Sequence, residues 1–235
     1  NNSNHPYLFE KQNGYYFGCR QNITLLQSKI NENISLFTNY CLNEKQLNEQ
    51  YLNYDYQTFV DHDTIIINSK AGTGKTTNTA KQLSQYLEHN KNFTILSLVN
   101  YISLADQQIK AFKEQGITLV NYQDVKLIDL EINHSVCCIK SIHKIQDTDM
   151  TKVILYIDEV TSFLKNLSEN QILDRNLKSI YLELIRIIKT CHKVIVSDAN
   201  ITDNVKNLLK HRNTTKEICI NNLFKKFQNV EAIRE

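Results

Sequence analysis

A short loop with two glycines, placed between an apolar run and an amphipathic stretch, constrains the fold of this chain most strongly. The loop reads Ser69-Lys70-Ala71-Gly72-Thr73-Gly74-Lys75-Thr76. It follows the apolar run at residues 64–68 and precedes a predicted helix at residues 77–87. A strand, a glycine loop that ends in Gly-Lys-Thr, and a helix together predict a phosphate-binding P-loop.

The residue types in this loop suit phosphate binding. Glycines allow backbone N–H groups to turn toward a phosphate, and the following helix adds its positive dipole end. Lys75 is predicted to reach the β- and γ-phosphates, and the Thr76 hydroxyl to hold Mg²⁺. Ser69 stands where the pattern has glycine, but a small residue can begin this turn. Thr77 completes the predicted nucleotide-binding segment.

The size and charge of the chain set broad limits. With 235 residues, of which 41% are hydrophobic, the chain can form one large domain, or one domain with a short arm. A formal net charge of +2 neither argues for nucleic-acid binding nor excludes it, because a basic groove can lie in a nearly neutral protein.

The 6 cysteines form no C-x-x-C pair, so a zinc site is not predicted. Their apolar surroundings favour buried, reduced thiols. The polar start shows no signal-peptide pattern, and no apolar run approaches the roughly 18 residues that a membrane span needs. We therefore expect a soluble intracellular protein with no membrane partner.

Apolar runs alternate with amphipathic stretches from residue 64 onward. Strands are predicted at residues 64–68, 93–99, 117–121, 136–139, 153–157, 194–197 and 217–220. Helices are predicted at residues 76–88, 103–115, 160–167, 175–191 and 202–211. Alternation of this kind predicts a three-layer α/β domain with a parallel central sheet, with ligands at the carboxyl ends of the strands.

The segment before the first strand is polar and aromatic. We predict an arm at residues 1–62 that is mainly helical, with short helices at residues 23–30 and 42–54. The P-loop domain is predicted over residues 63–222, and residues 223–235 are predicted to begin a linker.

A second set of candidate site residues follows the strand predicted at residues 153–157, where Asp158 and Glu159 come in sequence. A carboxylate at the end of a buried strand beside the P-loop strand can bind Mg²⁺, so Asp158 is a predicted metal ligand. Glu159 is the predicted general base that activates the attacking water.

Further segments carry a family resemblance. They are Asn100-Tyr101-Ile102-Ser103-Leu104-Ala105-Asp106-Gln107-Gln108, Lys140-Ser141-Ile142-His143-Lys144-Ile145, Asp158-Glu159-Val160-Thr161-Ser162-Phe163-Leu164 and Val196-Ser197-Asp198-Ala199. With the P-loop, this series resembles the helicase domain of herpesvirus-type replication origin-binding proteins, which are superfamily 2 helicases with relatives in giant DNA viruses. The resemblance covers about residues 64–209.

The resemblance implies a RecA-like motor domain that binds ATP and Mg²⁺. Ser103 matches a motif that touches the DNA backbone, although an amphipathic core helix with a serine cap is the alternative there. Ser141 and His143 match a second such motif, and a capped turn with a core histidine is the alternative. The family usually has an arginine near Tyr101, and this chain has none there.

Two further elements are interpreted through the same resemblance. Ser197 and Asp198 match a motif that senses the γ-phosphate, although Asp198 or Asn200 could instead cap the next helix. Gln57 lies upstream of the P-loop beside Tyr56 and Phe59, which is the arrangement that some superfamily 2 helicases use to read adenine; an ordinary surface glutamine is the alternative.

The resemblance implies an ATP-dependent DNA helicase motor domain of a replication origin-binding protein. Its partners would be DNA, either single-stranded or an origin duplex, a second RecA-like domain of a longer protein, and other replication proteins. If the chain is viral, the host nucleus or a cytoplasmic viral factory would be its location. A nucleotide-binding switch that controls assembly without unwinding is the alternative, and a nucleoside kinase fits less well.

Overall fold

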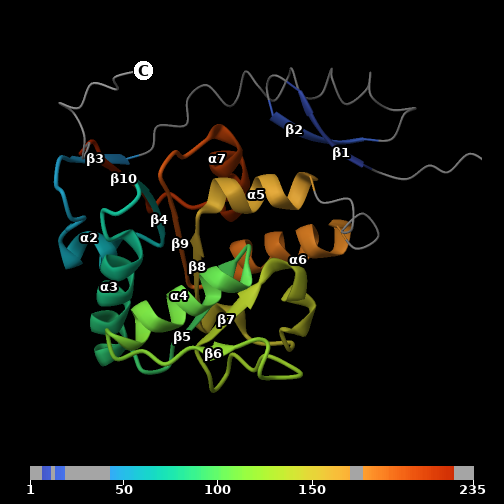
Figure 1. Cartoon of the computed structure of the whole chain (residues 1–235), viewed down its shortest axis with the longest axis horizontal. Coiled ribbons are helices and arrows are strands. Elements are labelled where there is room, and N and C mark those ends of the chain that lie inside the picture. Colours follow the sequence, from blue (N-terminus) through green and yellow to red (C-terminus); the bar gives the residue numbers. More distant parts are fainter. Residues whose placement is uncertain (1–6, 12–13, 19–42, 170–176, 225–235) are drawn as a thin grey trace, which may run out of the picture.

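The computed structural model describes residues 7–11, 14–18, 43–169 and 177–224 (Figure 1). Its main feature is an 8-stranded sheet in the order β3-β10-β4-β9-β8-β5-β7-β6. Every neighbouring pair in this sheet is parallel. In chain order the strands are β3 (Asn43–Leu47), β4 (Thr64–Ser69), β5 (Thr94–Val99), β6 (Val120–Asn121), β7 (Ser135–Cys138), β8 (Val153–Asp158), β9 (Lys193–Asp198) and β10 (Glu217–Asn222).

Helices cover both faces of the sheet, so the fold has three layers (Figure 1). One face carries α2 (Tyr56–Asp61), α3 (Lys75–His89) and α4 (Ile102–Lys113). The other face carries α5 (Val160–Glu169), α6 (Leu177–Thr190) and α7 (Asp203–Leu209). The 3₁₀ helices of the described residues are η1 (Ile139–Lys144), η2 (Met150–Lys152) and η4 (Lys210–Arg212).

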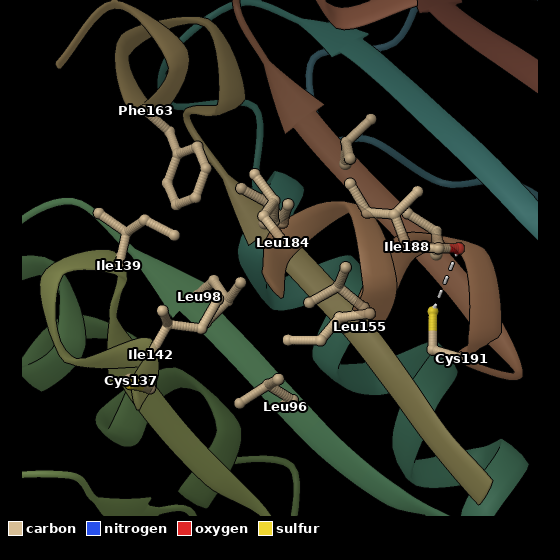
Figure 2. Close-up of a cluster of buried hydrophobic side chains, with 14 of the residues drawn as sticks. Leu96, Leu98, Cys137, Ile139, Ile142, Leu155, Phe163, Leu184, Ile188 and Cys191 are labelled. Atoms are coloured by element: carbon tan, nitrogen blue, oxygen red, sulfur yellow. Dashed lines mark hydrogen bonds between the residues drawn. The ribbon is translucent and has the colours of Figure 1, made fainter. Parts of the chain in front are cut away.

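The central strands are apolar on both sides, and alternate side chains divide between two cores. Ile65, Ile67 and Tyr156 belong to the core beneath α2, α3 and α4. Ile66 and Leu155 belong to the core beneath α5, α6 and α7. Figure 2 shows the second core, in which side chains from β5 and β8 meet those of α5, α6 and η1. Burial on both faces is the reason why the sequence reads as continuous apolar runs.

The structure confirms the predicted three-layer α/β class with its parallel central sheet. The strands β4, β5, β7, β8, β9 and β10 fall within two residues of their predicted bounds. The strand predicted at residues 117–121 is shorter, because only Val120–Asn121 pairs with β7. Ile117 and Leu119 are buried in the core without joining the ladder.

The prediction for the arm is wrong in its described part. Residues 42–54 do not form a helix; Asn43–Leu47 is instead an edge strand paired with β10. Its residues, Asn-Glu-Lys-Gln-Leu, are mostly fair helix formers, but the open edge of β10 offers backbone hydrogen bonds that outweigh this weak preference. The arm also contains an antiparallel hairpin of β1 (Tyr7–Lys11) and β2 (Gly14–Gly18). Its one helix among the described residues is α2, and the helix predicted at residues 23–30 lies outside them.

The parallel arrangement places the loops after β4, β5, β7, β8 and β9 at one edge of the sheet. We call this edge the carboxyl edge. Among the described residues, none of the helices has the length and apolar character that crossing a bilayer requires.

Candidate functional site

The predicted phosphate-binding loop, residues 69–76, lies at the carboxyl edge between β4 and α3, and we call it the glycine loop. Gly72 and Gly74 have φ values of 76° and 75°. L-residues with a side chain rarely adopt such values, so the loop conformation explains both glycines. Gly74 precedes α3, and no side chain caps that helix. The amide groups at the start of α3 are therefore suited to an anion.

Lys75 is held at the glycine loop by backbone oxygens. Its Nζ donates to the Ser69 carbonyl at 2.9 Å and to the Lys70 carbonyl at 3.3 Å. The Lys70 side chain contacts a different segment, since its Nζ donates to the Ala199 carbonyl at 3.3 Å. The loop after β4 is thus tied to the loop after β9.

Asp158 joins three elements through one buried carboxylate. Thr76 Oγ1 donates to Asp158 Oδ2 at 2.6 Å, and Ser197 Oγ donates to Asp158 Oδ1 at 2.5 Å. The Tyr156 hydroxyl lies 3.2 Å from Ser197 Oγ. Asp158 is only 8% exposed, so these bonds replace solvent. The structure therefore brings Thr76, Asp158 and Ser197 together, although they are far apart in the sequence.

Glu159 lies next to this cluster in an unusual backbone conformation. Its φ is 51°, a region that residues with side chains occupy at a cost and that is often found at functional sites. Its N–H donates to Asp158 Oδ1 at 3.0 Å. Burial raises the pKa of the Glu159 carboxyl, the negative charges of Asp158 and Asp198 raise it further, and Lys75 opposes them. A raised pKa is a property expected of a proton acceptor in an active site.

Asp198 anchors the start of α5. Its Oδ2 accepts from Thr161 N at 2.8 Å, and its Oδ1 accepts from Asn200 N at 3.1 Å. The predicted alternative, in which Asp198 or Asn200 caps the helix after β9, differs from this arrangement, because the N-cap of α7 is Thr202. Asp198 therefore connects β9 to the helix that begins immediately after Glu159.

The oxygen atoms of Thr76 and Asp158 fit a magnesium ion that arrives with a nucleotide. Mg²⁺ prefers hard oxygen ligands, and it commonly keeps several waters and substrate phosphates beside one or two protein groups. Within the described ranges, no group of three His, Cys, Asp or Glu side chains could hold a metal ion.

The predicted DNA-contacting residues lie on another part of the carboxyl edge. Ser103 is exposed in the first turn of α4, which follows β5. His143 is exposed and Ser141 half-buried in η1, which follows β7. Since β5 and β7 are neighbours, the two segments leave the sheet side by side. Cys138 Sγ donates to the Asn100 carbonyl at 3.3 Å and links them.

Two exposed side chains near these residues were missed from the sequence. Tyr101 is 55% exposed just before α4, and Lys140 is exposed in η1. An aromatic ring and a cation are the groups that stack on bases and contact phosphates. Their position beside Ser103 and Ser141 is the signal that could have identified them.

Gln57 does not join the glycine loop in this structure. It lies on α2, where its Nε2 donates to Asp61 Oδ1 at 2.6 Å. The neighbouring Phe59 ring packs against Tyr86, with ring centroids 5.7 Å apart. Tyr86 lies in the last part of α3, about 16 Å along the helix from Lys75. Adenine recognition by Gln57 stays a prediction.

The fold and the site define a three-layer α/β domain whose glycine loop and acidic strand ends meet at one edge of a parallel sheet. The chain belongs to the origin of replication binding protein family, whose family model matches residues 44–227. The match begins within β3 and so includes the edge strand that the sequence did not predict. The resemblance to herpesvirus-type origin-binding proteins is confirmed.

Several solved structures are similar to this chain. One is Dbp5 of S. cerevisiae bound to RNA and ADP BeF3, with 18% identity, a TM-score of 0.46, and coverage of 67% of this chain and 41% of that one. A hypothetical ATP-dependent RNA helicase from Sulfolobus tokodaii has 14% identity and a TM-score of 0.45, with coverage of 82% of this chain and 56% of that one. The SWI2/SNF2 ATPase core of Sulfolobus solfataricus with dsDNA has 14% identity and a TM-score of 0.46, with 72% and 37% coverage.

The chain thus spans 37% to 56% of the length of these solved chains. No curated protein matches the sequence.

Proposed function

We propose that this chain is an ATP-dependent DNA helicase motor domain of a replication origin-binding protein. One observation carries the proposal: Thr76 of the glycine loop and Ser197 of β9 both donate to Asp158, which directly precedes Glu159. A phosphate-binding loop, a metal-binding carboxylate and a base at one sheet edge are the parts that ATP hydrolysis requires. Family membership supports the same reading.

In the proposed reaction, the glycine loop N–H groups and Lys75 bind the β- and γ-phosphates of ATP. Glu159 accepts a proton from a water molecule as the water oxygen forms a bond to the γ-phosphorus. The bond from that phosphorus to the bridging oxygen breaks, and ADP leaves with the electron pair. Lys75 offsets the negative charge that develops on the departing oxygens.

Mg²⁺ would be held by Thr76 and Asp158 together with phosphate oxygens, and when bound it would neutralise phosphate charge. The Ser197 hydroxyl donates to Asp158 at 2.5 Å. Because Asp158 would bind the Mg²⁺ that accompanies the phosphates, Ser197 would respond to the γ-phosphate through Asp158. Asp198 would pass such a change to α5 through its bond with Thr161.

DNA would bind at the part of the carboxyl edge formed by α4 and η1. Ser103, Ser141 and His143 would contact backbone phosphates, which position a strand without reading its sequence. Single-stranded DNA or an origin duplex could supply those phosphates. The hydrogen bond from Cys138 to Asn100 connects the segments that lead into η1 and α4.

We further propose that a second RecA-like domain completes the motor, that residues 223–235 lead toward it, and that other replication proteins act with it. The ATPase domain would extend over residues 63–222 together with β3, because β3 completes the same sheet. Without an arginine from the second domain, turnover by this chain would be slow, since such a residue contributes about 10³–10⁵-fold.

The experiment that tests the proposal measures ATP hydrolysis by the wild-type chain and by Glu159→Gln. Because a general base contributes about 10²–10⁴-fold, we expect the variant to lose about 100-fold in kcat while ATP still binds. Glu131→Gln is the matched control, since Glu131 is exposed in the loop between β6 and β7. Its neighbour Leu130 accepts from Thr94 at the start of β5, so Glu131 lies near the amino ends of the strands and not at the carboxyl edge. Equal rates for wild type and Glu159→Gln would refute this role of Glu159.

A further inference from the structure

Ser69, which stands where the P-loop pattern has glycine, has a hydroxyl with two defined partners. It is 1% exposed. Its Oγ lies 2.7 Å from Thr73 Oγ1 and 3.1 Å from Asn222 Nδ2. The hydroxyl therefore links the glycine loop to the end of β10, a strand that contributes no residue to the proposed chemistry.

The donor in each of these side-chain hydrogen bonds follows from the single proton that each hydroxyl carries. Thr73 Oγ1 donates its single proton to the Lys70 carbonyl at 2.7 Å. Ser69 must then donate to Thr73, because a hydroxyl has one proton. Asn222 Nδ2 in turn donates to Ser69. One directed series thus runs from Asn222 through Ser69 and Thr73 to Lys70, and each bond polarises the next.

The last acceptor of this series, the Lys70 carbonyl, is also a hydrogen-bond partner of Lys75. The Lys70 carbonyl accepts both from Thr73 Oγ1 and from Lys75 Nζ at 3.3 Å. The Thr73 carbonyl accepts a hydrogen bond from Leu52 N at 2.7 Å. The glycine loop is therefore held by Leu52 and, through Ser69 and Thr73, by Asn222. The second connection ends at a carbonyl to which Lys75 also donates.

The Asn222 side chain is held in place by burial and by hydrogen bonds. It is 4% exposed, and all four hydrogen-bonding sites of its carboxamide are used. Nδ2 donates to the Glu49 carbonyl at 2.8 Å as well as to Ser69, and Oδ1 accepts from Glu49 N at 3.0 Å and from Phe224 N at 3.3 Å. Asn222 thus joins the glycine loop, the segment after β3, and the chain that leaves β10.

We propose that Asn222 is a positioning residue for nucleotide binding, which acts on the glycine loop through Ser69 and Thr73 without touching the nucleotide. This inference rests on the proposed function, because it assumes that the glycine loop binds phosphate.

The test is the dissociation constant of MgADP, measured by isothermal titration calorimetry on wild type and Asn222→Ala. The expected result is about tenfold weaker binding, the weight of one hydrogen bond in a coupled series. Asn221→Ala is the matched control, because Asn221 is on the same strand and bonds to Asn68 and Glu44, but not to the glycine loop. It should change the affinity less than twofold.

A double-mutant cycle with Ser69→Ala separates positioning from a merely structural role. In the Ser69→Ala background, Asn222→Ala should have no further effect on MgADP affinity, while melting temperatures show whether each variant is folded. Asn222→Asp provides a second variant, since a carboxylate cannot donate to Ser69, and it should weaken binding similarly.

Equal affinity losses in Asn222→Ala and Asn221→Ala, or a full effect of Asn222→Ala without the Ser69 hydroxyl, would overturn the inference alone. A wild-type chain that binds no MgADP would overturn the proposed function with it.

Discussion

At the level of single residues, Glu159 is distinguished by its backbone and by its charge environment. Its φ of 51° is one of two positive values at non-glycine residues in the described part of the chain. Its side chain is exposed, and its carboxyl is subject to the negative charges of Asp158 and Asp198, with Lys75 as the opposing charge. These two features follow from its place directly after the buried strand β8, where the chain turns sharply into α5.

The first prediction concerns the pH dependence of hydrolysis. Burial and two neighbouring carboxylates raise the pKa of Glu159, and the base must be ionised to accept a proton. Activity is therefore lost as pH falls through the raised pKa, so the acid limb of kcat should lie above the usual Glu range near 4.3. Asp198→Asn removes one of the negative charges and should move this limb to lower pH. An acid limb that does not move in that variant would contradict the electrostatic account.

The second prediction concerns the stability cost of the Glu159 backbone. Glycine accepts a φ of 51° without strain, so Glu159→Gly should be more stable than Glu159→Gln by up to about 1 kcal/mol. Comparing these two variants removes the charge effect, since both lack the carboxylate. Urea unfolding measures the difference, and a less stable glycine variant would show that the side chain, not the backbone, decides stability here.

Sequence reasoning predicted the glycine loop, Asp158 and Glu159 as site residues because each lies in a local pattern of strand, loop and helix, and the structure brings them to one edge of the sheet. It could not find Asn222, whose proposed role depends on the pairing of β10 with β4 and on Glu49 of the arm. It left two roles open for Asp198, and the structure shows a third, the anchoring of α5 through Thr161. Such contacts between distant segments have no local signal in a single sequence.

At the level of elements, the strands buried on both faces could be predicted because they are continuous apolar runs. The strand β3 could not, since it lies at the edge, is mostly exposed, and contains polar residues. Its conformation is decided by its partner β10 rather than by its own sequence. The helix predicted at residues 42–54 was wrong for this reason.

The third prediction concerns the attachment of α2 to the sheet. Lys193 of β9 is 2% exposed, and its Nζ donates to the carbonyls of Phe59 and His62 at the end of α2. Burial lowers its pKa to about 8. Lys193→Ala would leave two carbonyls without their donor and create a cavity, so we expect a loss of about 2–4 kcal/mol in the free energy of unfolding.

Lys45→Ala is the control for this prediction. Lys45 pairs with Asp55 at the other end of α2, but both side chains are substantially exposed, at 34% and 52%. An exposed ion pair contributes about 0–1 kcal/mol, so this variant should lose little stability in urea unfolding. Similar losses in the two variants would show that burial does not govern the attachment.

At the level of the whole molecule, the carboxyl edge divides into two neighbouring parts. The glycine loop and the ends of β8 and β9 form the part proposed for ATP binding and hydrolysis, while α4 and η1 form the part proposed for DNA. The two parts meet where β8 pairs with β5. Glu159 and the start of α5, which follow β8, therefore lie one strand away from the start of α4, which follows β5.

We propose that these two parts of the carboxyl edge act together, so that DNA at α4 and η1 stimulates ATP hydrolysis at Glu159. The most direct test is the rate of ATP hydrolysis with and without single-stranded DNA, measured on this chain and on the full product of its gene. The account predicts that DNA raises the rate severalfold in the full product, and that Glu159→Gln removes the stimulated hydrolysis. ATP binding with a rate that does not respond to DNA in either protein would contradict the account and favour a nucleotide-binding switch.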